Sequence, residues 1–294
     1  MNKKMFYFLD VVLIFSLTIF VLLDAFVIKR SYELVVDDKT STNNETISLN
    51  SVISNENYYE DENIKIELTE YEYLDTTIYV ADVQISSIDY LYSAFANSTY
   101  GKNVTDTVSD IAEDYNAILA INGDYYGARN SGYVLRNSVL YRDSVASENQ
   151  EDLIINSDGS FTIINEAQTK VDEIENALQI YSFGPCLINN YEISVSLNDE
   201  VGKAKASNPR TAICEIEPLH YLFVVSDGRT DDSEGLSLYE LASFLNNFNV
   251  KCAYNLDGGG SSTMIFNGNL INNPTTSGKS IKERSVSDAI CIGY

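Results

Sequence analysis

Residues 255–263 read NLDGGGSST and place an acid, three glycines and three hydroxyl side chains between two apolar runs, 250–256 and 264–266. This pattern predicts a strand, a tight turn and a second strand. Glycine allows a backbone to approach a ligand closely, and consecutive turn amides can bind an anion. The stretch therefore indicates a site for a phosphate or a sugar hydroxyl, with a flexible hairpin loop as the alternative. Walker-type nucleotide binding is disfavoured, because no lysine and no helix follow the glycines.

Length and composition favour one large folded domain. The chain has 294 residues, 45% of them hydrophobic, with 21 Tyr and 12 Phe, which is ample for a packed core. Its net charge of −24 argues against nucleic acid or an anionic membrane surface as a partner, since both require a basic face. An anionic substrate must therefore be bound by local positive groups.

The arginines supply such groups. Six of them lie in or beside polar, glycine-containing segments: Arg129, Arg136, Arg142, Arg210, Arg229 and Arg284. The planar guanidinium binds phosphate and carboxylate in a bidentate manner, so this placement in an acidic protein predicts an oxyanion site. Pairing of these arginines with surface carboxylates is the alternative.

Cysteine and histidine exclude several mechanisms. Cys186, Cys214, Cys252 and Cys291 are widely spaced, which disfavours a zinc site and predicts buried free thiols, with one disulfide as an option outside the cell. The one histidine, His220, follows a predicted turn and is a poor candidate for a catalytic triad. Catalysis must then use carboxylates, arginines, hydroxyls or an oxygen-ligated cation.

The N-terminal 60 residues divide into two parts. Residues 5–28 are largely apolar, and as a helix they would span about 36 Å at about 1.5 Å per residue, which is enough to cross a bilayer. We expect residues 1–30 to form a cytoplasmic tip and an uncleaved membrane anchor, with a signal peptide as the alternative. Residues 31–60 are polar and acidic and predict a solvated stalk. We then expect residues 61–294 to form the folded domain and to lie outside the cytoplasm.

Short strand-like runs dominate from residue 61 onward. A hairpin is predicted around residues 158–159, and residues 209–215 and 221–226 are predicted to pair. Helical periodicity is convincing only at 107–115 and 237–248, and Ser237 with Glu240 forms a capping-box pair. The predicted fold class is α+β: a mixed β-sheet domain with few helices, preceded by a single transmembrane helix.

Four polar segments lie directly at the ends of strand-like runs, where loops can place side chains in a cleft. They are AINGDYYG at 120–127, SNPRTA at 207–212, VSDGRTDDSEG at 225–235 and the NLDGGGSST stretch. Asp124, Asp227 and Asp257 each lie beside a glycine, with arginines between them. The recurrence favours one shared site over three independent turns.

Read in order, NGDYYG, NPRTA, SDGR with the helix SLYELASFL, NLDGGGSST and ERSVSDAI resemble the phosphodiester glycosidase family over residues 75–294. The resemblance implies hydrolysis of a sugar-1-phosphodiester at the glycosyl C–O bond, which releases free sugar. It implies five catalytic candidates: Asp124, Asp227, Asp257, Arg210 and Arg229. It also implies six substrate-binding candidates: Asn122, Gly258, Gly259, Ser261, Ser262 and Arg284. Asn255, which opens the NLDGGGSST stretch, is a seventh candidate on its position alone.

The expected chemistry uses an aspartate to activate water or stabilise the sugar cation, with Glu283 in reserve, while arginines stabilise the departing phosphate ester. No cofactor requirement is evident. The loop residues Asp231, Asp232 and Glu234 could ligate Ca²⁺, although a solvated loop is favoured.

The predicted protein is a membrane-anchored hydrolase at the cell surface that acts on a sugar phosphate or glycopolymer of a cell wall or exopolysaccharide. The alternatives are a non-catalytic carbohydrate- or phosphate-binding module and a phosphodiesterase that cleaves the P–O bond.

Overall fold

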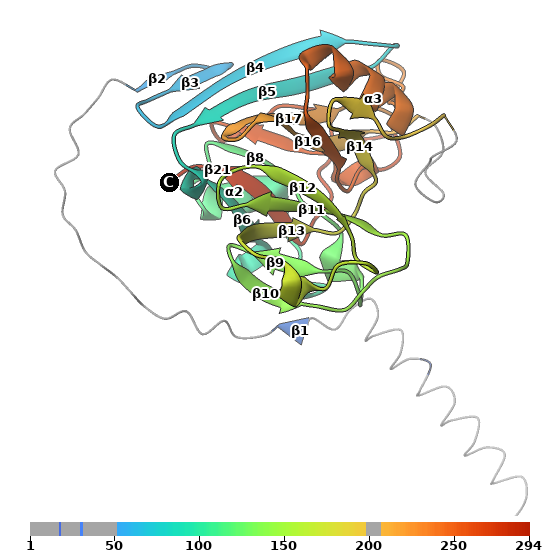
Figure 1. Cartoon of the computed structure of the whole chain (residues 1–294). Coiled ribbons are helices and arrows are strands. Elements are labelled where there is room, and N and C mark those ends of the chain that lie inside the picture. The colour runs from blue at the N-terminus through green and yellow to red at the C-terminus, as the bar shows by residue number, and fades with distance from the viewer. Residues whose placement is uncertain (1–17, 19–29, 32–51, 198–206) are drawn as a thin grey trace, which may run out of the picture.

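The computed structural model describes residues 18, 30–31, 52–197 and 207–294 (Figure 1). Apart from Thr18, the apolar segment 5–28 lies outside these residues. Nowhere in the described part of the chain is a helix both long enough and apolar enough to span a bilayer. The expected anchor therefore remains a prediction.

The largest sheet has nine strands in the order β15-β14-β18-β16-β17-β5-β4-β3-β2. Their bounds are β2 Ile53–Ser54, β3 Tyr58–Glu60, β4 Ile64–Glu72, β5 Thr77–Ile85, β14 Cys186–Asn189, β15 Glu192–Ile193, β16 Arg210–Glu217, β17 His220–Ser226 and β18 Cys252–Asn255. Because β3 pairs with β4, the sheet begins before residue 61. The expected stalk is thus part of the sheet at residues 53–60, and its stretch 32–51 lies outside the described residues.

Two five-stranded sheets complete the domain, in the orders β20-β19-β8-β21-β6 and β10-β9-β13-β11-β12, and β1 pairs with β7. The bounds in the first are β6 Leu91–Phe95, β8 Leu119–Asn122, β19 Met264–Phe266, β20 Asn269–Leu270 and β21 Asp288–Ile292. Those in the second are β9 Val134–Arg136, β10 Val139–Arg142, β11 Glu151–Asn156, β12 Phe161–Asn165 and β13 Ala177–Tyr181. The remaining pair is β1 Arg30–Ser31 and β7 Gly101–Lys102.

Every strand pairing in the described residues is antiparallel, which corrects the expected mixed sheet. Hairpin turns account for the pairs that are adjacent in sequence, such as β4–β5, β11–β12 and β16–β17, because antiparallel strands need only a hairpin whereas parallel strands need a long crossover. The two predicted hairpins are confirmed: β11 pairs with β12, and β16 pairs with β17.

Two α-helices are described, and both were predicted. Helix α2 (Val108–Asp114) begins after the N-cap Thr107, and α3 (Leu238–Leu245) has the expected capping box between Ser237 and Glu240. Short 3-10 helices occur at Ile88–Tyr90, Ala96–Ser98, Tyr126–Ala128, Val171–Glu173, Asn246–Phe248 and Gly259–Ser261. The predominantly β character with few helices is confirmed.

The core forms layers in the order helix, sheet, sheet, helix. One apolar cluster joins the inner faces of the sheets, with Phe223 and Tyr254 from the nine-stranded sheet meeting Ile121 and Phe266 from the β8 sheet. Helix α3 packs on the outer face of the large sheet, and α2 packs on the outer face of the β8 sheet. Figure 1 shows the β9–β13 sheet at the end of the molecule away from β4. All four cysteines are buried free thiols, as expected.

The stretch 255–263 does not form a hairpin. Strand β18 lies in the nine-stranded sheet and β19 lies in the β8 sheet, so the glycine-rich loop crosses between the two packed sheets. The predicted strand, turn and strand are present, but the two strands do not pair with each other. The loop therefore lies at the junction of the layers, next to the ends of β8 and β16.

Candidate active site

Asn122, the last residue of β8, fixes the glycine-rich loop to the neighbouring strands. Its Nδ2 donates to the carbonyl oxygen of Asp257 at 2.6 Å. Its Oδ1 accepts from Thr211 Oγ1 at 2.8 Å and from the amide of Thr263 at 3.2 Å. Asn122 is fully buried, so it positions Asp257 and does not line a cavity.

Two adjoining cavities meet at Asp257. We call the first the arginine cavity; it has a volume of about 320 Å³. Its lining residues are Tyr125, Arg129, Phe183, Asn208, Arg210, Arg229, Asn255, Leu256, Asp257, Gly258, Gly259 and Arg284. We call the second, of about 200 Å³, the hydroxyl cavity. It is lined by Asn103, Thr105, Asp124, Tyr125, Gly127, Ala128, Asp257, Ser261, Arg284, Ser285, Val286 and Ser287. Tyr125, Asp257 and Arg284 belong to both.

Asp257 is the carboxylate at this junction. Burial raises its pKa above the ordinary value, while a hydrogen bond from Ser261 and the charge of Arg284 oppose the shift. Arg284 also donates to Ser261 Oγ at 3.5 Å. A carboxylate with a raised pKa is a stronger base near neutral pH than an exposed one, which suits proton abstraction from water.

Arg229 and Arg284 lie against the glycine loop. A Cβ atom at Gly259 would lie 2.8 Å from Arg229 Nη2, and one at Gly260 would lie 2.8 Å from Arg284 Nη2. Gly259 also has φ +63°, a conformation that disfavours other residues. Burial and the neighbouring Arg284 lower the pKa of Arg229, so two like charges face the same space. Glycine is therefore required where the guanidinium groups approach the backbone.

Arg229 is fixed by uncharged oxygens. Its Nη2 and Nε donate to Asn208 Oδ1 at 2.8 and 3.1 Å, and its Nη1 donates to the carbonyl of Thr276 at 2.7 Å. Arg210, at the start of β16, donates through Nε to the carbonyl of Leu236 at 2.7 Å. Because neutral groups orient Arg229, its charge remains available to a bound anion.

The loop amides contribute less than the sequence indicated. The amides of Gly259, Ser261 and Ser262 donate to the carbonyls of Pro209, Gly258 and Gly259 at 2.8 to 3.3 Å. Two of those donors serve the loop itself, and the third ties the loop to Pro209 beside the start of β16. An anion in the arginine cavity must then be bound mainly by guanidinium groups.

Asp124 lines the hydroxyl cavity, but its carboxylate is occupied. Oδ2 accepts from Arg136 Nη2 and from the amide of Ser182, both at 2.9 Å, and Oδ1 accepts from the amide of Tyr126 at 3.0 Å. Arg136 is fully buried and also pairs with Asp288 at 2.8 Å. Arg136 thus pairs with carboxylates, but these are buried and are not the surface carboxylates of the expected alternative.

Asp227 lines neither cavity. It accepts from the amide and side chain of Asn273 at 2.8 and 2.9 Å and from Asn272 Nδ2 at 3.3 Å. Asn272 in turn donates to the carbonyl of Ser262 at 2.9 Å. Asp227 therefore anchors the segment behind the glycine loop.

The other predicted residues divide between the cavities and their surroundings. Asn255, Gly258, Gly259 and Arg284 line the arginine cavity, Ser261 lines the hydroxyl cavity, and Ser262 is buried behind them. Glu283 accepts from Ser109 at the start of α2 and lines neither cavity. His220 lies on β17 and pairs with Asp82 at 2.9 Å.

Sequence reasoning missed Tyr125, Phe183 and Asn208 as lining residues. In the NGDYYG segment, Tyr126 is buried, whereas the neighbouring Tyr125 is 47% exposed and lines both cavities. The turn after β8 has no strand periodicity, so the sequence did not show which of the two tyrosines would face the cavities.

The described residues contain no cluster of three or more histidine, cysteine or acidic side chains that could bind a metal. Asp231, Asp232 and Glu234 are exposed on the loop after β17. The choice between a solvated loop and a calcium site stays a prediction.

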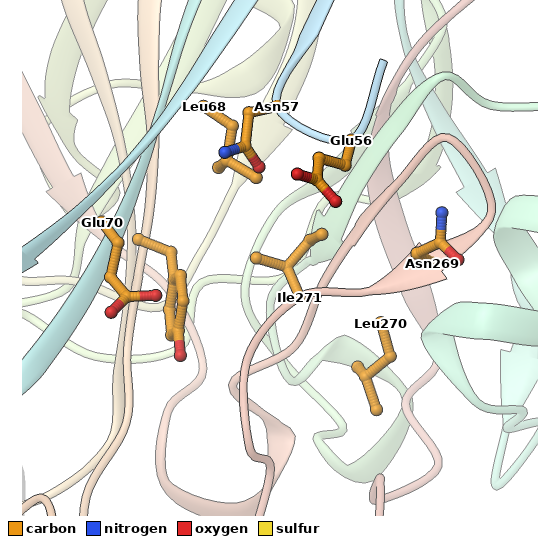
Figure 2. A pocket seen from close by; sticks show the side chains of 8 residues that line it. Glu56, Asn57, Leu68, Glu70, Asn269, Leu270 and Ile271 are labelled. Atoms are coloured by element: carbon orange, nitrogen blue, oxygen red, sulfur yellow. The ribbon is translucent and has the colours of Figure 1, made fainter.

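A separate acidic cavity of about 370 Å³ lies between the β2–β3 turn, β4, β5 and β20 (Figure 2). It is lined by Glu56, Asn57, Leu68, Glu70, Tyr79, Asn269, Leu270 and Ile271. It shares no lining residue with the other two cavities. Two carboxylates and no cation line it, so it is unsuited to a phosphodiester despite its size.

The fold and the cavities define a class: an antiparallel β protein of packed sheets, with an arginine-lined cleft where a glycine-rich loop crosses between two of them. The sequence model of the phosphodiester glycosidase family matches residues 115–293, and the chain belongs to that family of hydrolases. The expected family resemblance is thereby confirmed.

The chain is similar to the human N-acetylglucosamine-1-phosphodiester alpha-N-acetylglucosaminidase, with 29% identity over 205 residues, which are 63% of this chain and 39% of the human protein. It is also similar to the uncharacterized SPbeta prophage-derived protein YomE of Bacillus subtilis, with 26% identity over 67% of this chain and 31% of that protein. The chain thus spans less than half the length of these curated relatives.

Among solved structures, the zebrafish N-acetylglucosamine-1-phosphodiester alpha-N-acetylglucosaminidase catalytic domain, described as auto-inhibited by its pro-peptide, superposes with a TM-score of 0.62. The identity is 22%, over 79% of this chain and 83% of that one. A hypothetical protein from Synechocystis superposes with a TM-score of 0.53 at 16% identity, over 79% of this chain and 62% of that one. These two likenesses support the fold.

Proposed function

We propose that the protein hydrolyses a sugar-1-phosphodiester at the glycosyl C–O bond, releasing free sugar and leaving the phosphate on the acceptor. The observation that carries the proposal is the position of Asp257 between two unlike cavities. One is rich in guanidinium groups and suits the phosphate. The other is lined by hydroxyl and amide groups and suits one sugar ring.

In this arrangement the reacting bond lies beside Asp257. Its carboxylate activates water or stabilises the developing oxocarbenium charge, as carboxylates do in glycoside hydrolysis. Arg229 and Arg284 stabilise the negative charge on the departing phosphate ester. A phosphate leaving group is weakly basic, so its departure does not require a protonated acid.

Human and vertebrate relatives in the family act on N-acetylglucosamine-1-phosphodiesters by name, and we propose N-acetylglucosamine-1-phosphate esters as the first substrates to test here. The direct assay incubates the full chain with the methyl ester of N-acetylglucosamine-1-phosphate in oxygen-18 water. Free sugar that carries the label supports C–O cleavage. Sugar phosphate among the products supports a phosphodiesterase, and tight binding without turnover supports a non-catalytic module.

Asp257→Asn tests the proposed role of the carboxylate. We expect loss of turnover with an unchanged melting temperature, because asparagine preserves the shape but removes the charge. Asp231→Asn, in the exposed loop, is the matched control and should retain full activity. Retained turnover in the Asp257 variant would remove this residue from the mechanism.

We further propose that residues 5–28 anchor the chain in the cell membrane with the domain outside the cytoplasm, facing a glycopolymer of the wall or exopolysaccharide. The support is the apolar run and its flanking basic residues. Protease digestion of intact cells should remove the domain. A domain that becomes sensitive only after lysis would refute this location.

A further inference from the structure

A third cavity, which we call the side cavity, adjoins the candidate active site. It has a volume of about 150 Å³ and is lined by Tyr100, Gly101, Lys102, Tyr126, Gly127, Arg129, Asn130 and Arg142. It shares Arg129 with the arginine cavity and Gly127 with the hydroxyl cavity. The three cavities therefore border one another around the loop that follows β8.

The cations of the side cavity have uncharged partners. Lys102 Nζ donates to Asn130 Oδ1 at 3.1 Å, and Arg129 Nη1 donates to the carbonyl of Ser182 at 3.0 Å. Arg142 Nε donates to the carbonyl of Gly132 at 2.6 Å, and its Nη1 donates to two further carbonyls at 2.9 and 3.0 Å. Within the described residues, no salt bridge joins these three side chains to an acid.

Other cations of the chain do have carboxylate partners: Arg136 and Lys251 pair with acids at 2.8 to 3.0 Å. The three cations of the side cavity are instead held by neutral oxygens, as Arg229 is. Burial lowers the pKa of Arg142, and the charges of Asp124 and Glu166 oppose this shift only in part. An anion in the side cavity would place a further negative charge beside the guanidinium.

The arginine cavity already has cations for one phosphate. Arg229 and Arg284 lie against the glycine loop. Their two positive charges are offset by the Asp257 carboxylate and by the single negative charge of a phosphodiester. Lys102, Arg129 and Arg142 add positive charge beyond that need. Arg129 lies in the turn between β8 and β9, Lys102 on β7 and Arg142 at the end of β10.

We propose that the side cavity binds a second phosphate of the acceptor, so that the substrate is a sugar joined to a diphosphate or to a chain of successive phosphodiesters. The role as an acceptor subsite rests on the proposed function. The binding of two linked phosphates does not, and it can be measured without turnover.

The test measures binding of inorganic phosphate, pyrophosphate and tripolyphosphate to the full chain by calorimetry at fixed ionic strength. Lys102→Gln is the test variant, because glutamine removes the charge while it can still donate to Asn130. Lys65→Gln on β4 is the matched control, since Lys65 is similarly half-buried and also forms no salt bridge within the described residues.

We expect pyrophosphate to bind at least about tenfold more tightly than phosphate. Lys102→Gln should weaken pyrophosphate by about three- to tenfold and change phosphate by less than twofold, a range typical of one lost charge contact. Lys65→Gln should change neither. Equal weakening of both anions, or equal affinity of the unaltered protein for both, would overturn the proposal.

Turnover separates the two proposals. If the selective effect of Lys102→Gln on pyrophosphate is present but no sugar phosphodiester is hydrolysed, the second phosphate site stands and the proposed hydrolase activity fails. If the methyl ester is hydrolysed and the selective effect is absent, the hydrolase proposal stands and the second site fails.

Discussion

Substitution of Asp152 by asparagine should stabilise the protein, and the gain should grow with pH. Asp152 lies on β11 and is fully buried; Gln150 Nε2 lies 3.4 Å from its Oδ1, and its carboxyl interacts with the side chains of Glu166 and Ser182. Its neighbour Glu166 accepts from the amide of Tyr133 at 2.9 Å and from Ser182 Oγ at 2.7 Å. Since Glu166 has the donors, the shared proton belongs on Asp152.

Burial, and then the charge of Glu166, raise the pKa of Asp152 to about 10. A carboxyl whose pKa is raised by folding makes its full contribution to stability below its unfolded-state pKa. This contribution declines as pH rises from the unfolded-state pKa to the folded-state pKa. From the ordinary value of 3.8 to pH 7, the decline is about 4 kcal/mol at about 1.4 kcal/mol per pH unit. Above about pH 10 it ceases to grow.

Asparagine keeps a donor for Glu166 and does not titrate. The free energy of unfolding of Asp152→Asn, minus that of the unaltered protein, should therefore be up to about 4 kcal/mol larger at pH 7 than at pH 4. Urea unfolding at a series of pH values measures this difference. Asp158→Asn, at the exposed turn of the same hairpin, is the control, because hydrogen bonds from Ser160 lower the pKa of Asp158 and no stabilisation is expected. A difference independent of pH would refute the assignment of the proton.

Three further outcomes follow from the site and the core. The rate of hydrolysis should fall as pH drops through the raised pKa of Asp257, because the working carboxylate must be ionised; the acid limb in a pH profile should lie above the ordinary aspartate range of about 4. Gly259→Ala should weaken phosphate binding in calorimetry and destabilise the fold by about 1 to 3 kcal/mol, since its Cβ would meet Arg229 at a positive φ. Arg136→Met should lower the unfolding free energy by about 3 to 5 kcal/mol in urea titrations, because two buried carboxylates lose their cation.

Local signals in the sequence predicted the elements well. The capping box at Ser237 fixes the start of α3, and the Asp158 and Gly159 turn fixes the β11–β12 hairpin. Each of these depends on residues within a few positions of one another. Helix starts and hairpins are therefore readable without knowledge of the rest of the chain.

Pairing between distant strands was not predictable in the same way. Strands β18 and β19 are both short apolar runs beside glycines, and nothing in their patterns shows that they join different sheets. The expectation of a mixed sheet failed for the same reason. Strand propensity reports burial on a pleated surface and not the identity or direction of the partner.

The site was predicted in its composition more than in its roles. Clustering of arginines beside glycine segments correctly brought Arg210, Arg229 and Arg284 together in one cavity. The same rule grouped Arg136 with them, although it is paired with Asp124 in the core. A guanidinium suits a buried carboxylate as well as a phosphate, so residue type alone cannot separate the two uses.

The crossing of the glycine loop between the sheets explains how so acidic a chain would bind the proposed phosphodiester. A net charge of −24 repels a phosphodiester at a distance, but at physiological ionic strength that field decays over about 8 Å. In the proposed complex, Arg229 and Arg284 contact the phosphate inside the cleft, where screening by salt is weak. Recognition is therefore local, and it depends on glycine at 259 and 260, because a side chain at either position would displace the guanidinium groups that supply the attraction.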